Sequence, residues 1–348
     1  MSEFVTVRAV QAWGLDLSLF QFDGELTMAV MFLNADKTIY GRYGSRADKK
    51  SSRFFTTAGL VKAMEGALEL HRAVADVKKS LEGKKGKAPV WKTPEQLPAL
   101  KGRPNIKPAD GSRGGCVHCH QAGDGEAWSM RMAKKKVGDD LVWAYPMPDA
   151  VGLAMDPDER AAVKSVAAGS AAQKAGFKDG DRIVTMAGQP IISIADVQWV
   201  LHNAEVPGSV AVEVKRGEAT ESLKLALAGD WRRAGDFTWR VIVWSMRHRL
   251  VGTEPLSAAD DAEKRTLGVA AADMAIKVKG LPPSWVKEKA QSGFQPGDVI
   301  VQVDKRKDLV TESRMLAYLF QEVPLGGAAT FTVLRGGKRE QVVVKMQW

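Results

Sequence analysis

The feature that most constrains this chain is a repeat in its second half. Residues 175–184 read AGFKDGDRIV, and residues 292–301 read SGFQPGDVIV. In each copy a helical stretch follows, at 194–203 and 311–320, and each copy closes with a strand, a turn and a strand. A recurrence on this scale is the signature of one supersecondary unit present twice. We therefore expect two similar domains in the C-terminal half.

Local chemistry explains how each copy folds. The Gly-Phe-x-x-Gly-Asp stretch predicts a turn in which glycine supplies a positive φ, and the β-branched residues after it predict a strand. In the first copy the following helix has apolar residues at helical spacing on one face: Ile194, Val197, Val200 and Leu201. Each copy is thus expected to be a small, mixed domain of strands and helices.

The order strand, turn, strand, helix, strand, hairpin resembles the PDZ fold of bacterial periplasmic proteins, over residues 150–229 and 266–348. Residues 230–265, rich in Trp and Arg, are expected to connect the copies. The resemblance implies that extended peptides or protein C-termini add as a strand to an open edge beside the helix. It places the carboxylate-binding loops at Val151, Gly152, Leu153 and Ala154, and at Leu267, Gly268, Val269 and Ala270. The alternative is that the glycines only permit a tight strand start and that the groove serves intramolecular packing.

Proteolysis is not expected, although PDZ domains often accompany proteases. The chain has no Gly-x-Ser-Gly nucleophile segment, and it has only five histidines, two of them at His118 and His120. A nucleophile, base and acid at plausible spacing are therefore missing. We expect a binding protein and leave any enzymatic role open.

The N-terminal residues 1–82 predict a different unit. Residues 4–10 alternate like a strand, and residues 27–33 and 38–43 flank an Asn/Asp turn, which predicts a hairpin. A helix is expected next, with Thr57 as its N-cap. This order resembles the C-terminal half of a thioredoxin-like domain, found joined to PDZ domains in a family that includes selenoproteins. The resemblance implies a rival function, a thioredoxin-type oxidoreductase whose active-site motif lies upstream of this chain's start.

Residues 83–149 are expected to be a linker that carries the only two cysteines, Cys116 and Cys119, followed by His120. Cys-x-x-Cys-His is the attachment signature of c-type haem. On one helical turn the two thiols would bond the haem vinyl groups, and His120 would be the metal ligand on one side of the iron. Met147 is the candidate distal ligand, with Met130 and Met132 as competitors.

Two other chemistries remain open for this motif. Cys116, His118, Cys119 and His120 could hold zinc or copper, or the thiols could act as a redox pair. Haem attachment occurs outside the cytoplasm, so we expect a periplasmic or otherwise extracytoplasmic protein. No signal peptide is visible at Met1, and we expect the N-terminus to be truncated.

The net charge is +9, with lysine runs around residues 84–87 and 134–136. These runs lack a groove-reading motif or interleaved aromatic residues, so we interpret them as solvated linker and expect no nucleic-acid partner. No run of about 18 apolar residues occurs, and no membrane span is expected. The predicted fold class is α+β, with a partial thioredoxin-like domain followed by two PDZ domains.

Overall fold

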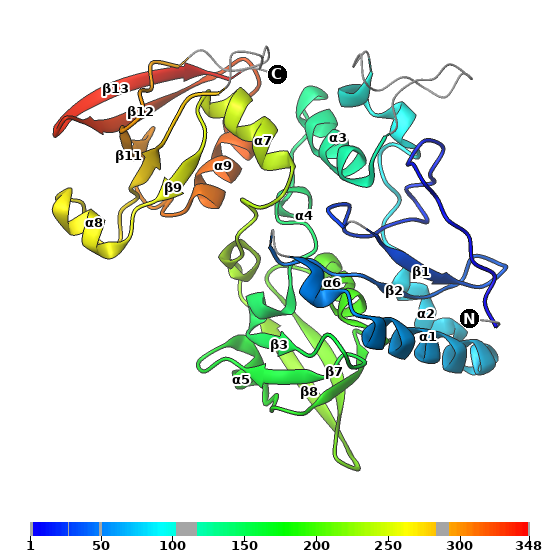
Figure 1. The fold of residues 1–348 in the computed structure, drawn as a ribbon. Helices are drawn as coiled ribbons and strands as arrows, with labels where there is room; N and C mark the ends of the chain where they lie inside the picture. The colour runs from blue at the N-terminus through cyan, green and yellow to red at the C-terminus, as the bar shows by residue number, and fades with distance from the viewer. Residues whose placement is uncertain (1–2, 27, 49–50, 102–116, 283–291, 347–348) are drawn as a thin grey trace. The chain divides into compact units, whose positions relative to one another are not determined.

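The computed structural model describes residues 3–26, 28–48, 51–101, 117–282 and 292–346 (Figure 1). Helices and strands are mixed along the chain, as the sequence predicts. Two compact units are present: residues 1–125 with 143–235, and residues 126–142 with 236–348. None of the described helices has the length and apolar character needed to cross a bilayer.

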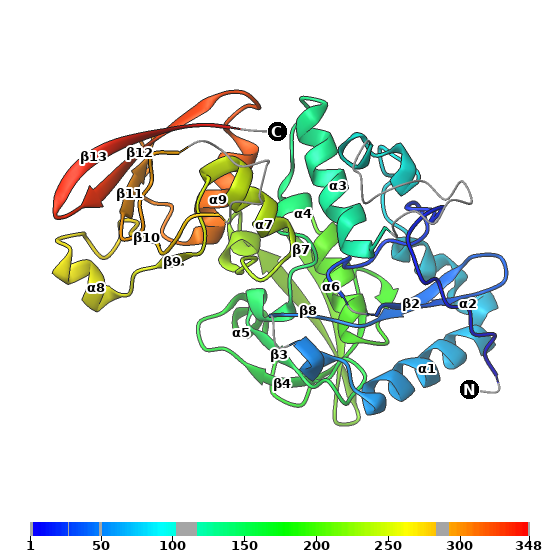
Figure 2. The same cartoon turned by 45° about the horizontal axis from the view of Figure 1, so that its top comes forward.

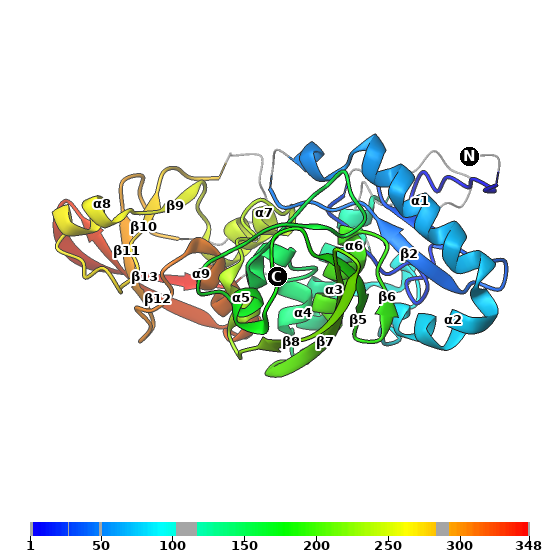
Figure 3. The same cartoon turned by 90° about the horizontal axis from the view of Figure 1, so that it is seen from below.

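The first unit begins with the predicted hairpin and helix. Strands β1 (Val30–Leu33) and β2 (Ile39–Tyr43) pair antiparallel. Helix α1 (Thr57–Arg72) is capped by Thr56, whose side chain accepts from the Gly59 amide, one residue before the expected cap. Helix α2 (Val74–Leu81) and a 3₁₀ turn (Glu82–Lys84) follow (Figure 3). A core between hairpin and helices buries Phe32, Tyr40, Tyr43, Ala63, Ala67 and Leu81.

The strand predicted at residues 4–10 is not formed. Val5, Val7 and Val10 are 94%, 86% and 73% exposed, and the small sheet contains β1 and β2 alone. Alternation favours a strand only where a neighbouring edge supplies hydrogen bonds, and these residues have none. The thioredoxin-like resemblance of this segment stays a prediction.

The first copy of the repeat completes this unit. Strands β3 (Leu153–Met155) and β4 (Val163–Val166) form a two-stranded sheet, followed by α5 (Ala171–Ala175). A second sheet has the order β6-β5-β7-β8, and helix α6 (Ile194–Asn203) lies between β6 and β7 in sequence. Figure 2 labels α6 together with β7 and β8 of this sheet. Its strands are β5 (Arg182–Met186), β6 (Gln189–Pro190), β7 (Gly208–Arg216) and β8 (Ala219–Leu227).

The second unit contains the second copy. Its five-stranded sheet has the order β13-β12-β11-β10-β9, formed by β9 (Leu256–Ala258), β10 (Ile276–Val278), β11 (Val299–Val303), β12 (Ala328–Arg335) and β13 (Lys338–Lys345). Its helices are α4 (Asp139–Val142), α7 (Ile242–Met246), α8 (Asp261–Thr266) and α9 (Glu312–Gln321). Strand β9 lies inside residues 230–265, so the expected connector contributes to the second sheet.

The same partly buried Asp–Arg ion pair is present in both copies. Arg216 donates to both carboxylate oxygens of Asp181, at 2.7 and 2.8 Å, and to the carbonyl of Gly176. Arg335 donates likewise to Asp298, at 2.8 and 2.7 Å, and to the carbonyl of Gly293. Each aspartate also accepts from the amide three residues before it. The repeat in sequence therefore corresponds to the same Asp–Arg pair and the same turn hydrogen bonds in both copies.

The expected linker, residues 83–149, is more structured than a linker. It contains helix α3 (Cys119–Met132) and two 3₁₀ turns (Pro94–Gln96 and Pro98–Leu100). Lys85 and Lys87 are exposed, in line with the solvated interpretation, but the side chain of Lys84 is fully buried. The interpretation is wrong for Lys84, because that residue has a buried carboxylate partner, described below.

Candidate peptide-binding groove

The turn before β3 is built around Gly152. A 3₁₀ turn (Pro148–Val151) ends at this glycine, whose φ of 90° lies in the left-handed region. A Cβ atom added here would lie 2.2 Å from the Cβ of Ser170, which is the N-cap of α5. Glycine is therefore required both by its φ and by the lack of space. The predicted loop residues Val151, Gly152, Leu153 and Ala154 lie at this turn and on the first positions of β3.

Strand β3 offers an edge. In the described part of the chain it pairs with β4 and with no other strand. Leu153 and Met155 point into the core, whereas Ala154 is exposed. An unpaired strand edge presents backbone donors and acceptors to which an extended peptide can add. The geometry on which strand addition depends is therefore available at β3.

Helix α6 is buried on all sides, from Ile194 to Leu201. Its first face, with Val197, Val200 and Leu201, joins the hydrophobic core of the repeat. The remaining circumference divides into two further faces, because residues three and four apart share a side of a helix. One of these carries Asp196, Trp199 and Asn203, and the other carries Ala195, Gln198 and His202.

The face of Asp196 packs on the N-terminal segment of the same unit. Lys84 Nζ lies 2.9 Å from Asp196 Oδ2, and the Arg42 amide donates to Asp196 Oδ1 at 3.1 Å. The Arg42 guanidinium lies over the Trp199 ring, 3.7 Å from its centroid, and Trp199 Nε1 donates to the Gly83 carbonyl. Burial lowers the pKa of Lys84, and Asp196 opposes this effect. The N-terminal segment is thus fixed to the face of α6 that carries Asp196 and Trp199.

The face of Gln198 and His202 contacts the segment just before the turn. Gln198 Nε2 donates to the Tyr145 carbonyl at 3.0 Å, and the Tyr145 amide donates to His202 Nδ1 at 3.3 Å. The two rings of Tyr145 and His202 stack with centroids 4.1 Å apart and planes 12° apart. The turn Pro148–Val151 also contacts α6. The sequence analysis did not single out Tyr145, Gln198 and His202 as site residues, because no local pattern marks them.

In the second copy the predicted loop residues lie between α8 and β10. Residues Leu267, Gly268, Val269 and Ala270 follow α8, and Leu267 and Val269 pack against a small apolar cluster beside β11. The position equivalent to Gly152 is held by Gly252, with a φ of 74°, which ends a π-helical turn (Arg247–Val251) and precedes β9. The pair Val251-Gly252, which repeats Val151-Gly152, is the sequence signal for this turn.

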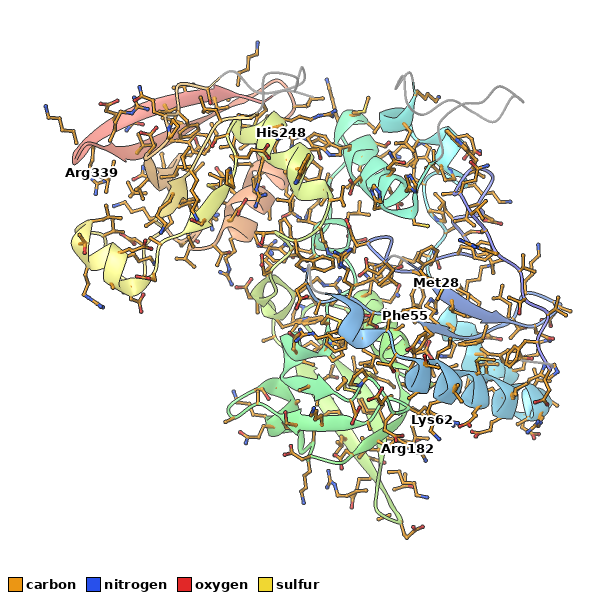
Figure 4. All side chains as sticks on the ribbon, viewed as in Figure 1. Met28, Phe55, Lys62, Arg182, His248 and Arg339 are labelled. Atoms are coloured by element: carbon orange, nitrogen blue, oxygen red, sulfur yellow. The ribbon has the colours of Figure 1, made fainter. Side chains whose placement is uncertain are left out.

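The turn of the second copy is held to its own helix. Arg247 donates to both carboxylate oxygens of Glu312, the first residue of α9. On either side of Gly252, His248 Nε2 lies 2.9 Å from Glu254 Oε2 (His248 is labelled in Figure 4). An Arg–Glu ion pair and a His–Glu contact therefore fix this turn, where the first copy uses an aromatic pair and an amide.

The candidate haem motif is only partly within the described residues. Cys116 lies outside them, and α3 begins at Cys119, so Cys119 and His120 occupy the first helical turn. The rings of His118 and His120 stack at 5.6 Å. Burial raises the pKa of the Cys119 thiol, and burial together with His118 lowers the pKa of His120. Met147 lies before the Pro148–Val151 turn and packs against the core of the first copy.

Buried nitrogen Nδ1 of His120 has no hydrogen-bond partner in the described part of the chain. Nearby, a small apolar cluster joins Val117 to the N-terminal segment and the Pro-rich turns: Ala12, Leu97, Leu100 and Val117. Among described residues, no three His, Cys, Asp or Glu side chains gather as a metal site. The haem, zinc and copper expectations therefore stay predictions.

Comparison with known proteins identifies the class of domain to which β3 and α6 belong. The family profile described as PDZ domain matches residues 130–227, which hold β3, α6 and the Gly152 turn. Residues 130–227 thus contain a PDZ domain, as the sequence indicated for the first copy.

Curated proteins from Pseudomonas also resemble part of this chain. A probable periplasmic serine endoprotease DegP-like from Pseudomonas savastanoi pv. phaseolicola is 26% identical over 200 residues, covering 57% of this chain and 40% of the relative. One with the same description from Pseudomonas fulva is 25% identical over 215 residues, covering 61% and 41%. The chain therefore spans about 40% of the length of these relatives.

Solved structures with local likeness include the HtrA3 PDZ domain bound to a phage-derived ligand, 35% identical over 19% of this chain and 60% of that one, with a TM-score of 0.17. Another is the HtrA-type protease AlgW with a decapeptide, 17% identical over 46% and 45%, with a TM-score of 0.24.

Proposed function

We propose that the PDZ domain of this chain captures extended peptides by their C-termini, without cleaving them. One observation carries the proposal: the turn Pro148–Val151, which contacts α6, ends at Gly152 and leads directly into β3, which pairs with β4 alone among the described strands. Amides of such a turn form a nest for a carboxylate, and the strand edge then binds the peptide backbone. Binding without cleavage follows from the missing nucleophile segment.

The second copy is proposed to be a PDZ domain too. Support comes from its Asp298–Arg335 pair, the positive φ of Gly252 and the position of β9 at the sheet edge. On this basis its carboxylate-binding turn would lie at Val251 and Gly252, in place of residues 267–270. The location proposed is extracytoplasmic, since the curated relatives are described as periplasmic.

Selection from a C-terminally displayed peptide library tests the proposal on the full chain. We expect enrichment of peptides that compete with one another for a site in the first unit. Cross-linking of a selected peptide with a photoreactive residue should label β3 or α6. If no sequence is enriched over a scrambled library, or if the label maps outside both copies, the binding proposal fails.

A second candidate function is favoured by the unpartnered Nδ1 of His120. We propose that Cys116 and Cys119 attach a c-type haem, with His120 as iron ligand and Met147 as the distal ligand. A haem would supply one-electron transfer. In this account Val117 and its apolar neighbours shield the attachment site from water.

Expression with a signal sequence in cells that mature cytochromes c tests the haem. Covalent haem gives peroxidase staining on a denaturing gel, and Cys116→Ala with Cys119→Ala should abolish it. Metal analysis of the same preparation distinguishes zinc and copper. A colourless, metal-free protein with two alkylatable thiols would exclude haem and both metals.

A further inference from the structure

Tyr145 lies just before the Pro148–Val151 turn and is tied to α6 through His202 and Gln198. Where a peptide's terminal carboxylate binds the turn at Gly152, its last side chain points toward the part of α6 nearest that turn. The α6 residues that contact the segment leading into the turn are Gln198 and His202. Tyr145 occupies this place, because its ring stacks on His202.

The backbone of Tyr145 is held in an uncommon conformation. Its φ of 47° lies in the left-handed region, which bulky residues rarely adopt. Hydrogen bonds fix both of its backbone groups, the amide to His202 and the carbonyl to Gln198. Two residues later Met147 packs against the core. Strained residues that their surroundings hold in place are concentrated at binding sites.

From this geometry we infer that Tyr145, stacked on His202, is the specificity-determining wall of the first groove and restricts it to ligands whose C-terminal side chain is small. The inference rests on the proposed peptide binding. The ring cannot shift toward α6, since His202 lies 4.1 Å from it, and its backbone is tied on both sides. A glycine or alanine terminus fits beside this wall, whereas leucine or phenylalanine meets the ring.

Two peptides that differ only in the last residue test this inference. A peptide selected on the full chain is synthesised with terminal alanine and with terminal phenylalanine, and binding is measured by fluorescence anisotropy. We expect the wild-type protein to prefer alanine by about tenfold or more, the scale of a steric misfit in a tight pocket. Equal affinities, or a preference for phenylalanine, would overturn the inference without any variant.

Variants then assign the preference to the ring. Tyr145→Ala should reduce or reverse the ratio, and Tyr145→Phe, which keeps the stacked ring, should retain it. Trp244→Ala is the matched control, because that aromatic side chain is 54% exposed and lies in the second unit. An unchanged ratio in folded Tyr145→Ala assigns the preference elsewhere and contradicts the inference. If neither peptide binds any of the four proteins, the proposed function itself fails.

Discussion

The amine of Lys84 lies 2.9 Å from the carboxylate of Asp196, and neither side chain reaches solvent. The backbone amide of Arg42 also donates to this carboxylate, and the Arg42 side chain is itself buried. Breaking a buried ion pair leaves an uncompensated charge in a medium of low polarity. The N-terminal segment and the PDZ domain are therefore expected to unfold together.

The first prediction concerns Asp196→Asn, which leaves the buried Lys84 amine without its carboxylate. We expect the free energy of unfolding to fall by about 3–5 kcal/mol, measured with urea. The exposed Asp158→Asn is the control, with an expected change below about 0.5 kcal/mol. Equal stability of the two variants would show that the pair does not join the segments.

Replacement of Gly152 by alanine tests the turn. Gly169→Ala is its matched control, because Gly169 has a φ of 74° and open space around its Cβ position. The control should lose about 1–2 kcal/mol from the left-handed conformation alone. Gly152→Ala should lose roughly 1–3 kcal/mol more, through the clash with Ser170. Similar losses in both variants would mean that the turn can relax away from α5.

The repeated Asp–Arg pair predicts a shared response to acid. Burial alone would raise the pKa of Asp181, but hydrogen bonds from Arg216 and from the Lys178 amide lower it. A folded pKa below the unfolded value contributes stability above about pH 4, and that stability is lost as the pH falls through the folded pKa.

Arg216→Gln should therefore lower the unfolding midpoint at pH 7, and its difference from wild type should shrink below about pH 4. Arg335→Gln should behave alike, because burial and the Arg335 hydrogen bonds act on Asp298 in the same way. A difference that persists unchanged at pH 2.5 would assign the effect to packing of the arginine stem.

Glu126 on α3 predicts the opposite pH dependence. Burial, aided by the charge of Asp140, raises its pKa to about 7. The folded state therefore holds this proton more tightly, and its stability contribution is lost as the pH rises from about 4.5 to about 7. Glu126→Gln should be more stable than wild type at pH 8 by about 2–3 kcal/mol and nearly equal to it at pH 4. A pH-independent difference would indicate that Glu126 stays charged.

Sequence patterns predicted the elements whose causes are local. The Gly-Asp turns, the hairpin before α1 and the helix 194–203 each follow from turn chemistry or helical spacing, and each is present. For the second copy the sequence predicts the loop at residues 267–270, which resemble residues 151–154, and the structure has these residues between α8 and β10. The role of residues 267–270 as a carboxylate-binding loop stays a prediction.

Other features depend on partners far away in the chain. Lys84 belongs to a basic run whose composition predicts exposure to solvent. Its burial is explained by its contact with Asp196 on α6. Tyr145 lies in a loop-like stretch, and its role at the groove follows from His202 and Gln198. No spacing rule connects such residues, because tertiary packing alone brings them together.

The most direct test of peptide capture compares a free C-terminus with a blocked one. A peptide selected on the full chain is titrated by calorimetry as its carboxylate and as its carboxamide. We predict saturable binding of the carboxylate and at least about tenfold weaker binding of the carboxamide, because the Gly152 turn would lose a charged acceptor. Equal affinity of the two peptides, or the absence of binding by both, would contradict the account.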